Sequence, residues 1–139
     1  MKIEFFLKEN ENLMDERAIG GGVYHIELLN GKKSVSLYIG ESIWMAERCG
    51  RHLYRLFRNP GYMGLSADDL NNNELTLRFS ILHTFNERKS ILGDKVYKDK
   101  ELEFIKKIRP LTQLETSDKQ INNKFNVVQK EMRKQGIKS

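Results

Sequence analysis

The chain of 139 residues has the usual length of one domain, and we treat residues 1–139 as a single domain with its own hydrophobic core. With 39% hydrophobic and 31% charged residues it is not a disordered chain, and no apolar run reaches the length of a membrane span. The first residues also lack the apolar core of a signal peptide, so we expect a cytoplasmic protein without a membrane partner. The net charge of +5 allows a polyanion as partner but does not decide for one.

The single cysteine, Cys49, excludes an intrachain disulfide and a zinc site built from several cysteines. Any bound metal would then have oxygen ligands, which favours a hard cation such as Mg²⁺. For Cys49 itself a small buried thiol is the simplest interpretation.

The N-terminal segment begins with a short apolar run, residues 2–7, whose pattern does not decide between an edge strand and a helix turn. A polar connector follows, so residues 1–19 are predicted to be an N-terminal extension. Three glycines at positions 20–22 then precede the first long strand. A close backbone approach to another group and a plain loop are equally compatible with them.

Two runs rich in β-branched and aliphatic residues, 23–29 and 35–39, flank the turn sequence of residues 30–33 and predict a β-hairpin. Residues 74–84 alternate between apolar and polar side chains, which predicts a third strand. Together with the helical patterns this indicates an α+β fold, a small three-stranded antiparallel sheet flanked by helices. The hairpin brings Tyr24 and Tyr38 near one another, although core packing of both rings is the plainer alternative.

The next pattern is helical from Ser42, a predicted N-cap, to Phe57. At about 100° per residue, four side chains fall within one arc and four others lie opposite. The arc contains Arg48, Arg51, His52 and Arg55; the opposite side contains Ala46, Gly50, Leu53 and Phe57. We expect the second set to pack on the sheet. The first carries no acid, which favours an anion-binding face over an ordinary solvated one.

Residues 58–73 form an excursion from the core, with a turn at residues 59–61 and a short capped helix at 65–69. After the third strand a short helix to Leu92, a break at Gly93 and a longer helix to Ile108 are predicted. Residues 119–139 hold a C-terminal helix, with apolar side chains at helical spacing over 120–135. Docking of this helix on the core is the simplest interpretation; contact with DNA or a second subunit is the alternative.

An acid stands inside the apolar stripe of the longer helix. Glu101 shares that stripe with Tyr97, Phe104, Ile105 and Ile108, whereas Glu103 points toward water. A carboxylate in such a place needs a cation or several donors. Pairing with an arginine, such as one of the first helix, and coordination of a divalent metal both satisfy this need. His25 and His83 lack a second histidine at ligand spacing and are interpreted as ordinary sheet residues.

These residues resemble the GIY-YIG endonuclease family over about residues 22–113. Gly22-Val23-Tyr24 resembles the first triplet of the family with Val for Ile, and Tyr38-Ile39-Gly40 matches the second. Arg48 and His52 match the catalytic arginine and a position that is often His or Tyr. The segment from Glu101 to Pro110 resembles the family pattern of a glutamate followed by an aliphatic or aromatic pair and a proline. Gln113 stands where members often have Asn.

The resemblance implies a metal-dependent DNA endonuclease, compact and restriction-like or repair-like, that hydrolyses phosphodiester bonds. Its implied catalytic residues are Tyr24, Tyr38, Arg48, His52 and Glu101, with Glu101 as the ligand of Mg²⁺ or Mn²⁺. Arg51, Arg55 and Gln113 are predicted to contact DNA. A homodimer is compatible with the sequence. The alternative function is a nucleic-acid-binding module of GIY-YIG ancestry that does not cut.

Overall fold

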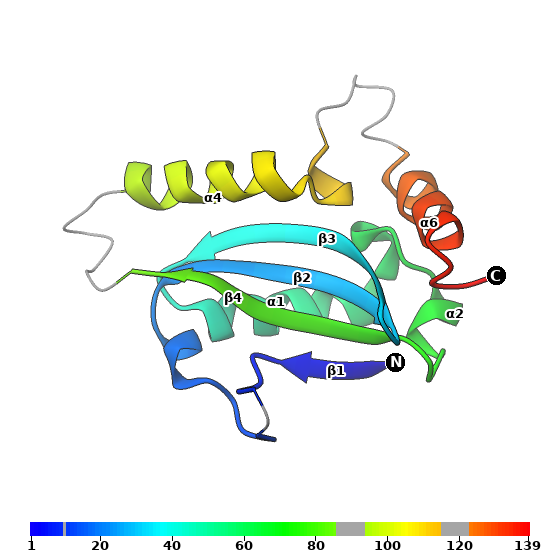
Figure 1. Ribbon diagram of the computed structural model, residues 1–139, viewed down its shortest axis with the longest axis horizontal. Helices are drawn as coiled ribbons and strands as arrows, with labels where there is room; N and C mark the ends of the chain where they lie inside the picture. Colours follow the sequence, from blue (N-terminus) through cyan, green and yellow to red (C-terminus); the bar gives the residue numbers. More distant parts are fainter. Residues whose placement is uncertain (10, 86–93, 115–122) are drawn as a thin grey trace.

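The computed structural model describes residues 1–9, 11–85, 94–114 and 123–139, which form an α+β fold around one mixed sheet (Figure 1). The strands are β1 (Lys2–Phe5), β2 (Gly22–Asn30), β3 (Lys33–Ser42) and β4 (Thr76–Thr84), in the order β1-β4-β2-β3. Strands β4, β2 and β3 are antiparallel, as predicted, and β1 runs parallel to β4 at one edge. Within the described residues, no helix is both long and apolar enough to cross a bilayer.

The fourth strand corrects the prediction of a three-stranded antiparallel sheet. Residues 2–5, part of the predicted extension, pair with β4, and backbone hydrogen bonds from Lys2 to Leu75 and from Phe6 to Phe79 hold them there. The aromatic rings of Phe5, Phe6 and Phe79 lie within 6.3 Å of one another, centroid to centroid. Short-range periodicity leaves this run undecided because its partner strand lies about 70 residues away in the sequence.

The hairpin of β2 and β3 brings the triplets at residues 22–24 and 38–40 side by side. Tyr24 pairs with Gly40, and Ile26 pairs with Tyr38, so the two tyrosines lie diagonally across neighbouring strands. A β-bulge follows at Ile26/Glu27, which lets the edge strand bend. The predicted hairpin is confirmed, and both strands extend beyond the predicted ends.

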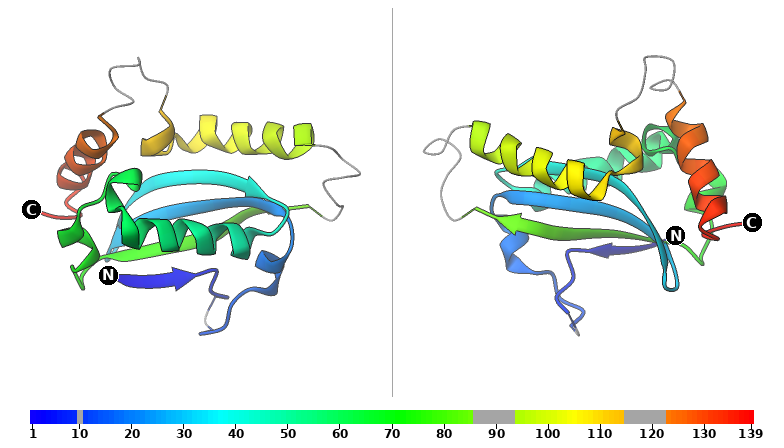
Figure 2. Two further views of the ribbon diagram at one scale, coloured as in Figure 1. Left: turned by 180° about the vertical axis from the view of Figure 1, so that it is seen from behind. Right: turned by 45° about the horizontal axis from the view of Figure 1, so that its top comes forward.

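Helix α1 (Met45–Arg58) packs across one face of the sheet (Figure 2, left). Ser42 does not cap it: Ser42 ends β3, and its hydroxyl accepts a hydrogen bond from the backbone N–H of Trp44, the residue at the N-cap position. The buried side chains of α1 are Met45, Cys49 and Leu56. Cys49 is therefore a buried thiol, as predicted.

The predicted packing face of α1 was wrong by about a quarter turn of the helix, at 100° per residue. Ala46 and Leu53 are partly buried against the core, but Gly50 and Phe57 are exposed. The helix is rotated so that His52, predicted on the outer arc, borders the core. Its two ring nitrogens make hydrogen bonds there, and this satisfies a polar group that is half-buried.

Helix α4 (Asp94–Ile108) runs along the β3 side of the sheet (Figure 1) and is followed by the 3₁₀-helix η3 (Leu111–Gln113). Arg109 between them has φ 58, in the left-handed region, which reverses the chain directly before Pro110. The longer predicted helix is thus confirmed. The short helix predicted up to Leu92 lies outside the described residues.

The excursion and the C-terminal helix pack against each other. The excursion holds the 3₁₀-helix η2 (Pro60–Met63) and α2 (Ala67–Leu70), whose predicted cap is a reciprocal pair between Ser66 and Asp69. Helix α6 (Lys124–Lys134) lies over it and buries Val128, Gln129 and Met132. Docking of the tail helix is confirmed for these residues; residues 119–122 lie outside the described part of the chain.

Candidate active site

Tyr24 lies across the second triplet of the hairpin. Its side chain is only 1% exposed, and its ring lies over the neighbouring strand at Gly40. A Cβ placed on Gly40 would lie 2.2 Å from the Tyr24 hydroxyl oxygen, which no side chain can do. A glycine is therefore needed at position 40, because any side chain there would occupy the space of the Tyr24 hydroxyl.

His52 on α1 connects Tyr24 to a third tyrosine, Tyr62 of η2. Its Nε2 lies 2.8 Å from the Tyr24 hydroxyl, and its Nδ1 lies 2.9 Å from the Tyr62 hydroxyl. Tyr62 also donates its proton to the backbone carbonyl of His52 at 3.0 Å, and the two rings are stacked at an interplanar angle of 3°.

These contacts are compatible with a tautomer of His52 that serves as a base. When Tyr62 donates its one proton to the His52 carbonyl, it accepts at Nδ1, and Nδ1 then carries the imidazole proton. In this tautomer Nε2 is an acceptor that faces the Tyr24 hydroxyl at 2.8 Å.

The electrostatic surroundings keep His52 neutral. Burial, together with the positive charges of Arg48 and Arg55, lowers the pKa of His52 to about 4. At neutral pH the imidazole has no proton on Nε2 and can accept one. Two of the three causes are guanidinium charges, so an anion bound to Arg48 and Arg55 would raise this pKa and make His52 a stronger base.

Both tyrosines hold their protons in the ligand-free protein. Burial raises the pKa of Tyr24, and the nearby Cys49, Tyr38 and Glu101 raise it further, against the charge of Arg48. Burial and the charge of Glu101 also raise the pKa of Tyr38, while Arg48 and a hydrogen bond with Tyr24 act in the opposite direction. A free phenolate is thus disfavoured at this site at neutral pH.

The same effects show that the predicted catalytic residues act on one another. The charge of Arg48 is felt at Tyr24, Tyr38 and His52, and the charge of Glu101 at both tyrosines. These residues come from the hairpin, α1 and α4, far apart in the sequence. The structure therefore places Arg48 and Glu101 within electrostatic range of both tyrosines, with His52 hydrogen-bonded to Tyr24.

The other two arginines of the predicted arc are engaged differently. Arg51 forms an ion pair with Glu47, one turn earlier, so the expectation of an acid-free surface is not met at this position. Arg55 places its guanidinium carbon 4.4 Å from the centre of the Tyr62 ring. No ion pair involves Arg48 or Arg55 among the described residues, and their charges are the ones left for an external anion.

Glu101 is half-buried in the stripe of α4 that faces the sheet, whereas Glu103 is exposed and pairs with Lys100. The stripe prediction is confirmed. The described residues contain no group of three or more His, Cys, Asp or Glu side chains suited to a metal. One carboxylate with water and substrate oxygens is a donor set that Mg²⁺ accepts.

Gln113 clamps the edge strand. Its side-chain oxygen accepts from the Ile39 N–H at 2.8 Å, and its amide nitrogen donates to the Ile39 carbonyl at 2.7 Å. Both ends of the amide are thus used on the backbone between Tyr38 and Gly40. The predicted DNA contact of Gln113 stays a prediction; the observed contact is structural and fixes the second triplet.

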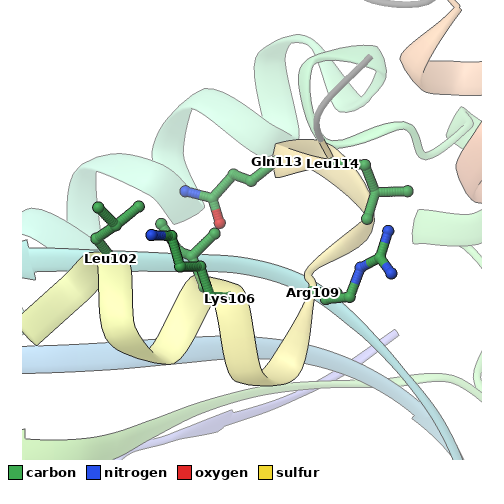
Figure 3. A pocket seen from close by; sticks show the side chains of 6 residues that line it. Leu102, Lys106, Arg109, Gln113 and Leu114 are labelled. Atoms are coloured by element: carbon green, nitrogen blue, oxygen red, sulfur yellow. The ribbon is translucent and has the colours of Figure 1, made fainter.

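A surface pocket of about 540 Å³ lies beside this clamp, between α4 and η3 (Figure 3). Its lining includes Lys106 and Arg109, which face Leu102, Gln113 and Leu114. None of the five predicted catalytic residues lines it. Its two cations make it a basic surface next to the strand that carries Tyr38.

Tyr62 is the site residue that the sequence analysis missed. It lies in the excursion, ten residues after His52, and no helical or strand spacing relates the two. The only available signal was an aromatic residue with a hydroxyl directly after the turn at residues 59–61.

Comparison of the chain with protein-family models, with curated proteins and with solved structures finds no match. Arguments about its function therefore depend on the residues, their contacts and their charges.

Proposed function

We propose that this protein is a metal-dependent endonuclease that hydrolyses phosphodiester bonds of DNA. The observation that carries the proposal is the cluster of Tyr24, Tyr38, Arg48, His52 and Glu101, assembled from the hairpin and two helices. It combines a phosphate-binding cation, a directed base and a half-buried carboxylate. These are the groups that the resemblance to GIY-YIG endonucleases requires at these positions.

Arg48 binds the scissile phosphate. Its guanidinium can donate two parallel hydrogen bonds to phosphate oxygens, and it stabilises the extra negative charge of the transition state. Arg55 binds a neighbouring phosphate while it remains stacked on Tyr62. Lys106 and Arg109 form a second basic surface beside Gln113, which is bound to the strand that carries Tyr38.

The attacking water loses its proton along a chain of side chains. Tyr38, the less buried of the two tyrosines, contacts the water; its proton moves to Tyr24 as the Tyr24 proton moves to Nε2 of His52. Each phenol gives one proton and receives one, so neither becomes a free phenolate. Binding of the phosphate to Arg48 and Arg55 removes part of the charge that lowers the pKa of His52, so the base becomes stronger when substrate is present.

Glu101 would hold Mg²⁺ or Mn²⁺ at the side of the tyrosines. The metal ion, when bound, supplies charge that polarises the phosphate and eases departure of the 3′ oxygen. Glu101 itself contributes a fixed carboxylate on α4, which the apolar stripe around it orients.

The compact chain fits a restriction-like or repair-like enzyme working in the cytoplasm, and cutting both strands with one such site requires a homodimer. A non-catalytic binding module is the alternative. The full set of proton-transfer groups argues against it, because binding alone does not need a histidine hydrogen-bonded to two tyrosine hydroxyls.

A plasmid-nicking assay with Mg²⁺ or Mn²⁺ tests the proposal. The wild-type chain should nick, whereas Glu101→Gln and Arg48→Gln should lose roughly a hundredfold or more of the rate, the size expected for a transition-state group. Glu103→Gln on the same helix is the matched control and should be unaffected. DNA binding by every form without nicking by any would favour the binding module and overturn the nuclease.

A further inference from the structure

Two aromatic side chains on the outer side of α1 have about half or more of their surface exposed. Trp44 at the start of the helix is 49% exposed, and Tyr54 near its end is 66% exposed. Figure 2, left, shows the outer side of α1 with no described element over it. Burial of such large rings is normally favourable, so their exposure in the isolated chain points to a contact with something else.

Exposed guanidiniums stand between the two rings. Arg51, Arg55 and Arg58 fall with Tyr54 within about 100° of the helix circumference at 100° per residue, and Trp44 directly precedes the helix as its N-cap residue. Arg58 lies over the Tyr54 ring at 5.5 Å and donates to its hydroxyl at 3.2 Å. We call these five residues the aromatic-arginine stripe. The one acid of α1 within the same arc, Glu47, is paired with Arg51.

The net charge of the stripe indicates which kind of partner it binds. Three arginines and one glutamate give it a net positive charge, so a second copy placed on the same surface would bring like charges together. A nucleic acid offers phosphates to the guanidiniums and flat base faces to the rings. Arginines interleaved with exposed aromatics are the side chains that bind a single strand through its backbone and its bases.

We propose that the aromatic-arginine stripe binds unpaired nucleotides of a single-stranded or branched DNA, with bases stacked on Trp44 and Tyr54. In a duplex the faces of the bases are covered by their neighbours, so only unpaired bases can use these rings. The carbonyl of Trp44 accepts a hydrogen bond from the Arg48 N–H at 3.1 Å, so a base on Trp44 would lie beside the phosphate that Arg48 binds. The placement of the cut beside this base rests on the proposed function; the binding does not.

Trp44 is the only tryptophan of the chain, so its fluorescence reports on this surface alone. The full-length protein is titrated, with EDTA present to prevent cleavage, with a thymidine 20-mer and with a blunt duplex of equal length. We expect the single strand to quench the fluorescence to saturation and the duplex to leave most of it. Salt should weaken the binding steeply, because phosphates are bound by arginines.

Replacement of each ring is then tested with a labelled single strand by fluorescence anisotropy. Trp44→Leu and Tyr54→Leu should each weaken binding roughly fivefold to hundredfold, the measured range for loss of one base stack. Phe57→Leu is the matched control: Phe57 is 55% exposed on α1 but lies outside the stripe, and its loss should change nothing. Circular dichroism confirms that each variant is folded.

Three results would overturn the inference. They are unchanged single-strand binding in both leucine variants, duplex binding that is equally tight and equally dependent on Trp44, and a dimer in sedimentation that either variant dissociates. Plasmid nicking by the wild type in any of these cases would leave the nuclease proposal standing. Quenching by the single strand with no nicking of any substrate would instead remove the nuclease and keep the binding surface.

Discussion

Two polar clusters, both reached from the excursion at residues 58–73, have opposite electrical character. In the C-terminal cluster of Ser66, Asp69, Gln129 and Lys138, the carboxylate of Asp69 accepts from Lys138 at 2.8 Å, from Gln129 at 2.8 Å and from the Ser66 N–H at 2.9 Å. Burial would raise the pKa of Asp69, but these hydrogen bonds lower it overall. Its charge is compensated within the protein.

The site cluster of Tyr24, His52 and Tyr62 instead has a neutral base with two cations beside it, Arg48 and Arg55, that lower its pKa. Its hydrogen bonds are complete, but its positive charge has no carboxylate partner among the described residues. A cluster whose charges are paired within the protein stabilises the fold. A cluster whose positive charges have no internal partner, and which lies beside a base, is suited to bind an anionic substrate.

The C-terminal cluster gives the largest expected effect on stability. Asp69→Ala removes the acceptor of three donors and leaves Lys138 without its anion, which should lower the free energy of unfolding by about 3 kcal/mol. Chemical denaturation measures it. Lys138→Met, whose side chain is 19% exposed, should cost less because Gln129 and Ser66 still compensate Asp69. A smaller loss for Asp69→Ala than for Lys138→Met would contradict the compensated cluster.

The site cluster should respond in activity more than in stability. Tyr62→Phe removes the acceptor at Nδ1, so His52 is free to take the other tautomer, which cannot accept from Tyr24. We expect roughly tenfold to hundredfold slower nicking, with about 1 kcal/mol lost from the free energy of unfolding. Ser34→Ala removes an exposed hydroxyl outside the site and the stripe and should leave the duplex-nicking rate unchanged. Equal rates for both variants would argue against a role of Tyr62 in orienting His52.

Local sequence patterns predicted most of the helices and strands, and they pointed to the five candidate catalytic residues. The hairpin, β4 and α4 have clear periodicity, and the placement of Glu101 over Glu103 follows from the stripe on α4. The strand β1 and the rotation of α1 could not be predicted in this way. Each depends on a partner distant in the sequence, β4 for the first and the hydrogen bonds of His52 to Tyr24 and Tyr62 for the second.

The roles of Gln113 and Tyr62 were beyond sequence reasoning for a related reason. Gln113 reaches Ile39 because the chain reverses at Arg109, where φ is 58. Residue propensities do not predict a positive φ at a non-glycine residue before proline. Tyr62 meets His52 only because α6 and the excursion pack together. Such contacts are set by tertiary structure.

Substitution of Gly40 and of Gly50 tests the contact between Gly40 and the Tyr24 ring. Gly40→Ala places a methyl group 2.2 Å from the Tyr24 hydroxyl oxygen, so Tyr24 must move away from His52. We expect a loss of about 1–3 kcal/mol in the free energy of unfolding and a parallel loss of nicking. Gly50→Ala, with no atom within 4 Å of the new methyl, should stabilise α1 by about 0.5–1 kcal/mol. Destabilisation by both would show that the contact with Tyr24 is not the cause.

The finest test is the titration of His52 itself. We expect its ring resonances in NMR to titrate with a midpoint at about 4 in the free protein, against 6.5 for an ordinary histidine. Because the folded pKa is below the unfolded one, the stability that neutral His52 contributes is complete above pH 6.5 and is lost as the pH falls toward 4.

Arg55→Gln should raise the midpoint, since the Arg55 charge lowers it, whereas Arg133→Gln on the distant α6 should not. Inorganic phosphate should raise it in the wild type and less so in Arg48→Gln, because the anion then loses one of its two cations. A midpoint near 6.5, or a midpoint unchanged in Arg55→Gln, would mean that the charges of Arg48 and Arg55 do not lower the pKa of His52.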